Sequence, residues 1–165
     1  MDRWIHPAIF FFIGALILPL FRGKAKKFVI LLIPALSIID VAFMMEGIYG
    51  SYNFLNADII FGRVDKLSLV FAWVFTIMGF LGAIYALHVE EDGHHMAAYF
   101  YVGASLGAIF AGDYLTLFIF WEIMAFSSVF LVWYRKEKKS IAAGYRYLLV
   151  HVFGGLCFFT GMMLY

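Results

Sequence analysis

The chain has 165 residues, of which 65% are apolar, 21% aromatic and only 14% charged, and its formal net charge is +1. A soluble domain has about half apolar and about a quarter charged residues, so this composition excludes an ordinary soluble domain and predicts an all-α, polytopic membrane protein. The single Cys157 stands in an apolar run, which indicates a buried thiol and offers neither a disulfide framework nor a metal cluster.

Apolar runs along the chain predict a single transmembrane domain, residues 1–165, with six membrane-spanning helices. A helix needs about 20 residues to cross the hydrocarbon core, and the fourth run is the shortest of the six. The expected helices cover residues of about 4–21, 28–48, 67–89, 96–111, 113–134 and 141–164.

Positive charge follows the first apolar run and is concentrated in two loops. Residues 22–27 and 135–139 together hold eight Lys and Arg, whereas the opposite side holds Arg3, Arg63 and Lys66. No small-residue cleavage pattern follows the first run, so it is expected to be a retained helix rather than a signal peptide. The positive-inside rule then places both basic loops in the cytoplasm and both termini outside, in the inner (cytoplasmic) membrane.

Asp40 is an unusual residue in the second expected helix. It lies thirteen residues beyond Lys27, which predicts a position at mid-depth in the bilayer. An intramembrane acid is costly, so it needs a partner or a function. Two roles are open: a local hydrogen bond to a neighbouring helix, and a place in an ion path.

Polar residues separate the second expected helix from the third. Residues 50–66 are expected to form an external loop, and Asp65 with Ser68 three residues later forms a capping pattern for the third helix. That helix ends in His88 to His95, a run of three histidines and three acids. The three histidines of this run lack the i, i+4 spacing of paired metal ligands on a helix. We therefore expect a solvated turn and no metal site.

Glu122 in the fifth expected helix is the main functional candidate. It lies about 18–20 Å from the basic run at Arg135, near the middle of a hydrocarbon core of about 30 Å. An acid at this depth usually faces protein or water and exchanges protons or ions. The alternative is a hydrogen-bonded glutamate that only fastens two helices. Asp113 lies about 180° around the helix from Glu122 and is expected to be a structural cap.

His151 in the sixth expected helix falls at a depth similar to that of Glu122, when both are measured from the same basic loop. A histidine beside a desolvated carboxylate makes a reasonable proton path. The alternative is a core histidine bonded to a backbone carbonyl. No cofactor is expected, because a haem would need two facing histidines at mid-depth and only His151 lies deep.

Three motifs resemble one known family. The run from Gly112 to Ser128 (GDYLTLFIFWEIMAFSS) resembles the glutamate-bearing fifth helix of the antiporter-like membrane subunits, which occur in Mrp-type sodium/proton antiporters, complex I and membrane-bound hydrogenases. Val64–Ser68 (VDKLS) opens a helix as it does in that family. Arg146–Gly155 (RYLLVHVFGG) is similar to the Mrp D-type and hydrogenase-type members.

The resemblance implies a partial antiporter-like fold and an N-terminal half, or a short member, of an ion-translocating subunit. In the family the glutamate matching Glu122 pairs with a lysine of the seventh helix, which this sequence does not include. The implied partners are other membrane subunits, lipid, H⁺ and, if sodium is exchanged, Na⁺, with no nucleic acid. No catalytic chemistry of its own is expected, and the alternative is a non-conducting scaffold subunit. The chain expressed alone is expected to show no sodium/proton exchange.

Overall fold

A computed structural model describes residues 4–54 and 57–164, which form six helices and one β-hairpin. The elements are α1 (Pro7–Ile17, continued by the 3₁₀ turn η1, Leu18–Leu20), α2 (Gly23–Ala42), β1 (Gly47–Phe54), β2 (Ala57–Val64), α3 (Lys66–Tyr85, continued by the 3₁₀ turn η2, Ala86–His88), α4 (Asp92–Ile109), α5 (Tyr114–Trp133) and α6 (Lys138–Leu164). The predicted all-α fold with six helices is confirmed.

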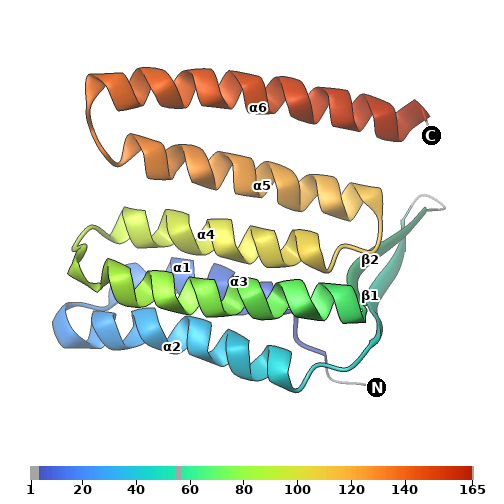
Figure 1. The fold of residues 1–165 in the computed structure, drawn as a ribbon, viewed down its shortest axis with the longest axis horizontal. Coiled ribbons are helices and arrows are strands. Elements are labelled where there is room, and N and C mark those ends of the chain that lie inside the picture. Colours follow the sequence, from blue (N-terminus) through green and yellow to red (C-terminus); the bar gives the residue numbers. More distant parts are fainter. Residues whose placement is uncertain (1–3, 55–56, 165) are drawn as a thin grey trace.

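Successive helices run in alternating directions, so the described residues have two opposite ends (Figure 1). One end carries the hairpin, and the other carries the two basic loops; we call them the hairpin end and the basic end. α1 packs against α2 and α4, α5 packs against α4, and α6 packs against α5 at the edge of the bundle. Arg3, which contributed to the predicted charge asymmetry, lies outside the described residues.

The segment expected to be an external loop forms a β-hairpin, and its place outside the membrane stays a prediction. β1 and β2 pair antiparallel, with Gly47 opposite Val64 and Asn53 opposite Asp58. The hairpin is also bonded to the rest of the fold, because the Arg63 amide donates to the Phe110 carbonyl (2.7 Å) and the Gly112 amide donates to the Ile60 carbonyl (2.9 Å). These long-range bonds stabilise a two-stranded hairpin, which in isolation is only marginally stable.

Two helices differ most from their predicted bounds of 28–48 and 96–111. α2 begins at Gly23 and ends at Ala42, because the chain needs the following residues to enter β1 at Gly47. Gly23 has φ +59°, a conformation that glycine adopts without steric cost, and it lets the chain turn from η1 directly into α2. α4 begins at Asp92, because the carboxylate of Asp92 in its first turn pairs with Lys26 (2.7 Å).

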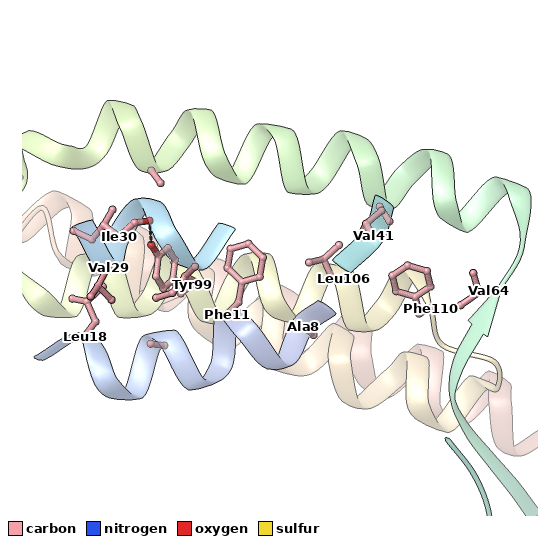
Figure 2. Close-up of a cluster of buried hydrophobic side chains, with 14 residues drawn as sticks. Ala8, Phe11, Leu18, Val29, Ile30, Val41, Val64, Tyr99, Leu106 and Phe110 are labelled. Atoms are coloured by element: carbon pink, nitrogen blue, oxygen red, sulfur yellow. Dashed lines mark hydrogen bonds between the residues drawn. The ribbon is translucent and has the colours of Figure 1, made fainter. Parts of the chain in front are cut away.

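The core lies between α1, α2 and α4 and includes one polar bond (Figure 2). Pro34 inside α2 has no N–H, so it cannot bond to the carbonyl of Ile30 four residues earlier. The hydroxyl of Tyr99 on α4 donates to that carbonyl instead (2.5 Å), while its ring packs edge-on against Phe11. A tertiary hydrogen bond thus replaces the helical bond that proline removes.

This arrangement predicts a coupled effect of two substitutions. Tyr99→Phe leaves the buried Ile30 carbonyl without a donor and is expected to lower the free energy of unfolding by about 1–3 kcal/mol. In a Pro34→Ala background the restored amide of residue 34 can bond to that carbonyl, so Tyr99→Phe should then cost much less. Unfolding of the four variants in mixed micelles measures the coupling, and equal costs in both backgrounds would contradict it.

Large apolar side chains remain exposed on the outer faces of the bundle. Val70, Val74, Met78 and Leu81 form an exposed stripe along α3, each of them more than half exposed. In the described part of the chain, Lys66–His88, Tyr114–Trp133 and Lys138–Leu164 are long and apolar enough to cross a membrane, and Pro7–Leu20 is a shorter apolar helix. Such apolar surface requires lipid or a partner subunit rather than water.

Candidate proton site between α5 and α6

Glu122 lies near the middle of α5 and faces α6. Its Oε1 atom is buried and accepts no hydrogen bond from any described residue. A Cβ atom at Gly155 of α6 would overlap this oxygen. The missing side chain at Gly155 therefore makes the space in which the carboxyl group lies against the neighbouring helix.

His151 lies one helical turn from Gly155, on the same side of α6. Its ring packs against the ring of Tyr147 (centroids 4.7 Å apart) and lies near that of Trp121 (6.3 Å). Among the described residues none forms a hydrogen bond with His151, so the carbonyl partner considered for a core histidine is not found there. The ring lines a cavity of about 260 Å³ together with Trp121, Val150, Gly154 and Phe158.

The structure thus places Glu122 and His151 at one helix interface. No hydrogen bond joins their side chains, and one turn of α6, about 6 Å, separates His151 from the glycine that faces Glu122. The adjoining cavity has the volume for water, and His151 and Trp121 are the polar side chains in its otherwise apolar lining. Proton transfer between the two groups is therefore possible through water or after a change of side-chain rotamer.

Asp40 is not part of this site. It lies in the last turn of α2, shortly before the chain enters the hairpin, and its depth in a bilayer stays a prediction. Its Oδ2 atom is buried and receives no hydrogen bond from a described residue, so the predicted local bond to a neighbouring helix is not seen. Asp40 lines a separate cavity of about 390 Å³ with Trp4, Glu46 and Tyr49.

The two other acids singled out from the sequence lie at helix starts. Asp65 is the N-cap of α3: it accepts from the Ser68 amide (2.7 Å) while the Ser68 hydroxyl accepts from the Asp65 amide (2.8 Å). The bond from the Ser68 amide holds the pKa of Asp65 below its usual value. Asp113 is the N-cap of α5 and accepts from the Thr116 amide (2.8 Å) and hydroxyl (2.5 Å).

Asp113 also accepts from the Ile60 amide of β2 (2.7 Å), so it joins the hairpin to α5. Asp113→Ala removes the cap and leaves that amide unpaired, and is expected to lower the free energy of unfolding by about 2–3 kcal/mol. Asp58→Ala, which removes an exposed hairpin acid, is the control. Unfolding in mixed micelles measures the stability of both variants. Equally small losses in the two would show that Asp113 does not hold the hairpin to α5.

The same carboxylate predicts a pH dependence. Partial burial acts to raise the pKa of Asp113, but the hydrogen bonds from Thr116, Ile60 and Leu115 outweigh it and lower the pKa below the usual value of 3.8. The stabilisation is therefore complete above pH 3.8 and is lost as pH falls through the lower folded-state pKa.

The acidic turn at the basic end binds both basic loops. Lys26 pairs with Asp92 and donates to the Glu90 carbonyl (2.5 Å), and Lys136 pairs with Glu91 (2.5 Å). The hydrogen bond and the charge of Glu91 raise the pKa of Lys136. The predicted solvated turn is thus an ion-paired connection. Two of its three histidines lie within hydrogen-bond distance of backbone carbonyls, His88 of Tyr85 and His95 of Val89, whereas Nδ1 of His94 is buried without a partner among the described residues. The described residues contain no cluster of three or more metal-ligating side chains.

Two residues differ from what the sequence suggested. Cys157 was expected to be buried and is exposed on α6.

His6 was not singled out from the sequence, yet its side chain is 6% exposed. It caps α1 by accepting from the Ala8 amide (3.1 Å), and it lines a cavity of about 700 Å³ beneath the hairpin. The sequence signal for the cap was a side-chain acceptor immediately before Pro7 at the first position of α1.

The fold and site define the chain as a multi-pass integral membrane protein with an antiporter-like helical arrangement. Residues 111–165, which hold Glu122 and His151, match the family described as NADH:quinone oxidoreductase/Mrp antiporter, TM. The comparisons support an antiporter-like family, as the sequence motifs predicted.

Individual relatives agree with this class. The chain is 29% identical over 181 residues to the Na(+)/H(+) antiporter subunit A1 of Staphylococcus haemolyticus, covering 97% of this chain and 22% of that protein. It is 28% identical over 107 residues to subunit A1 of Staphylococcus aureus strain JH9, covering 61% and 13%.

A solved structure shares the fold. A chain in the structure of the membrane-bound sulfane sulfur reductase, an archaeal respiratory membrane complex, superposes with a TM-score of 0.78 and 22% identity, covering 94% of this chain and 34% of that one. The chain therefore spans only a fraction of the length of the proteins it matches.

Proposed function

We propose that the chain contributes a proton path to a multisubunit cation/proton antiporter or ion-pumping respiratory complex, with Glu122 as its proton-exchanging group. The observation that carries the proposal is the Glu122 carboxyl group: it lies mid-helix, and its Oε1 atom is buried without a hydrogen-bond donor among the described residues. An ionised acid in the bilayer centre costs about 2.5–3.5 kcal/mol, which favours a group that takes up and releases a proton.

His151 is the proposed exchange partner of Glu122. It lies at the same helix interface and lines a cavity with room for water. Histidine exchanges protons near neutral pH, so the two groups can pass a proton in either direction when water bridges them. Asp40 lies near the hairpin end and is proposed only for a separate, peripheral part of an ion path.

The proposed partners are other membrane subunits, because two relatives bear the name of an antiporter subunit and the fold recurs in a respiratory membrane complex. The test is Glu122→Gln in the assembled complex, with assembly and translocation measured separately. A scaffold subunit would keep normal translocation in this variant. The scaffold alternative has less support, because a glutamate that fastens helices would bond across the interface, and Oε1 does not bond to a described residue.

We also propose six spans in the inner membrane with both termini outside, because the basic loops lie together at one end. Single-cysteine labelling of intact cells tests this topology in a Cys157→Ser background, which removes the exposed native thiol. A cysteine at Ser51 in the hairpin should react with an impermeant reagent, and one at Lys24 should not. The reverse pattern would overturn the orientation.

A further inference from the structure

We infer that the hydroxyl groups of Ser128 and Tyr147 form a proton relay between the basic end and the His151–Glu122 site. The inference rests on the proposed function, because it assigns the route by which a proton reaches that site. Ser128 on α5 and Tyr147 on α6 are joined by a hydrogen bond of 2.9 Å between their hydroxyl oxygens.

The residues of the proposed relay lie one after another along the interface between α5 and α6. Ser128 lies about 9 Å along α5 from Glu122, toward the basic end. On α6, Tyr147, His151 and Gly155 are spaced four residues apart and so share one side of the helix. Because α5 and α6 are antiparallel, the order from the basic end is the hydroxyl pair, then His151, then the Glu122–Gly155 contact.

The Ser128 hydroxyl has the bonding pattern that a relay requires. It lies within hydrogen-bond distance of two acceptors, the Ala125 carbonyl (2.6 Å) and Tyr147 Oη (2.9 Å). A hydroxyl carries one proton and two lone pairs, so it can donate to only one of them at a time and can rotate between them. Tyr147 lies beside the site, because its ring packs against the His151 ring (centroids 4.7 Å apart), and water or a change of rotamer is needed to join its hydroxyl to the imidazole.

The transfer leaves no net charge on either hydroxyl group. Tyr147 Oη releases its proton toward a His151 ring nitrogen, directly or through water, as it accepts one from Ser128 Oγ. Ser128 Oγ in turn accepts a proton from water on the basic side. Tyr147 is 39% exposed, so α5 and α6 do not enclose the pair, and the relay requires water at that surface. Each oxygen therefore gains one O–H bond for each that it loses.

The test uses the assembled complex in proteoliposomes and follows proton uptake with a pH-sensitive dye. Tyr147→Phe keeps the ring packed on His151 and removes only the hydroxyl group, and Ser128→Ala removes the other half of the pair. Each should slow maximal uptake by about tenfold or more, since a positioned proton donor typically accounts for at least that much. Ser128→Thr, which keeps a hydroxyl group, should restore most of the rate.

Two neighbouring residues supply matched controls. Ser127 donates only to the carbonyls of its own helix, and Tyr145 packs against Trp133 outside the relay. Ser127→Ala and Tyr145→Phe should transport normally. If Glu122→Gln blocks uptake while Tyr147→Phe and Ser128→Ala do not, the relay is wrong and the proposed function stands. If Glu122→Gln transports normally, the proposed function fails, and the relay that depends on it fails too.

Discussion

Glu122→Gln in the assembled complex is expected to reduce ion translocation by at least about a hundredfold, the lower end of what a proton-transfer group contributes. Glutamine keeps the size of the side chain, and the space opposite Gly155 can hold it, so the helix interface should stay intact. The amide cannot take up and release a proton near neutral pH. The change therefore separates the exchange of a proton from packing.

Two measurements and a control variant make this result decisive. The amount of assembled complex should equal that of the unchanged protein, while proton uptake into proteoliposomes should fall. Glu137→Gln is the control, because that acid is exposed in the basic loop and pairs only with Arg135. Normal uptake by the Glu122 variant would favour a scaffold subunit, and loss of assembly would show that the carboxyl group holds the interface together.

Gly155→Ala is expected to displace the Glu122 carboxyl group and to slow translocation by about tenfold or more, because a misplaced proton-transfer group loses much of its effect. The new methyl group would overlap Oε1, so either the carboxyl group or α6 must move. Because Oε1 is the far end of a flexible side chain, the carboxyl group is expected to rotate away, so stability should change little and the loss should appear in transport.

Gly161 provides the matched control for this substitution. A Cβ atom at Gly161 meets no other atom within 4 Å, so Gly161→Ala should keep the transport rate and stabilise α6 slightly. In a Glu122→Ala background, which removes the carboxyl group, Gly155→Ala should cause no further loss of transport. Equal transport by the Gly161 and Gly155 variants would show that the contact with Glu122 has no role in the position of the carboxyl group.

The sequence by itself determined the features that follow from composition, charge and short spacing. Membrane insertion of an apolar helix depends on its own residues, and a capping pattern such as Asp65 with Ser68 forms within one turn, so both can be read locally. Counting residues from the basic loops also placed Glu122 and His151 in the middle of α5 and α6. These are uninterrupted helices, along which depth increases regularly by about 1.5 Å per residue.

Only the tertiary structure decided which residues meet. The end of α2 was predicted too late, because it depends on the hairpin that follows, and that hairpin is bonded to the distant turn between α4 and α5. The contact of Gly155 with Glu122, the bond between Ser128 and Tyr147, and the bond from Tyr99 to the carbonyl freed by Pro34 all join different helices. Hydropathy gives the length of each helix, but the rotation that brings two side chains together is fixed by packing against its neighbours.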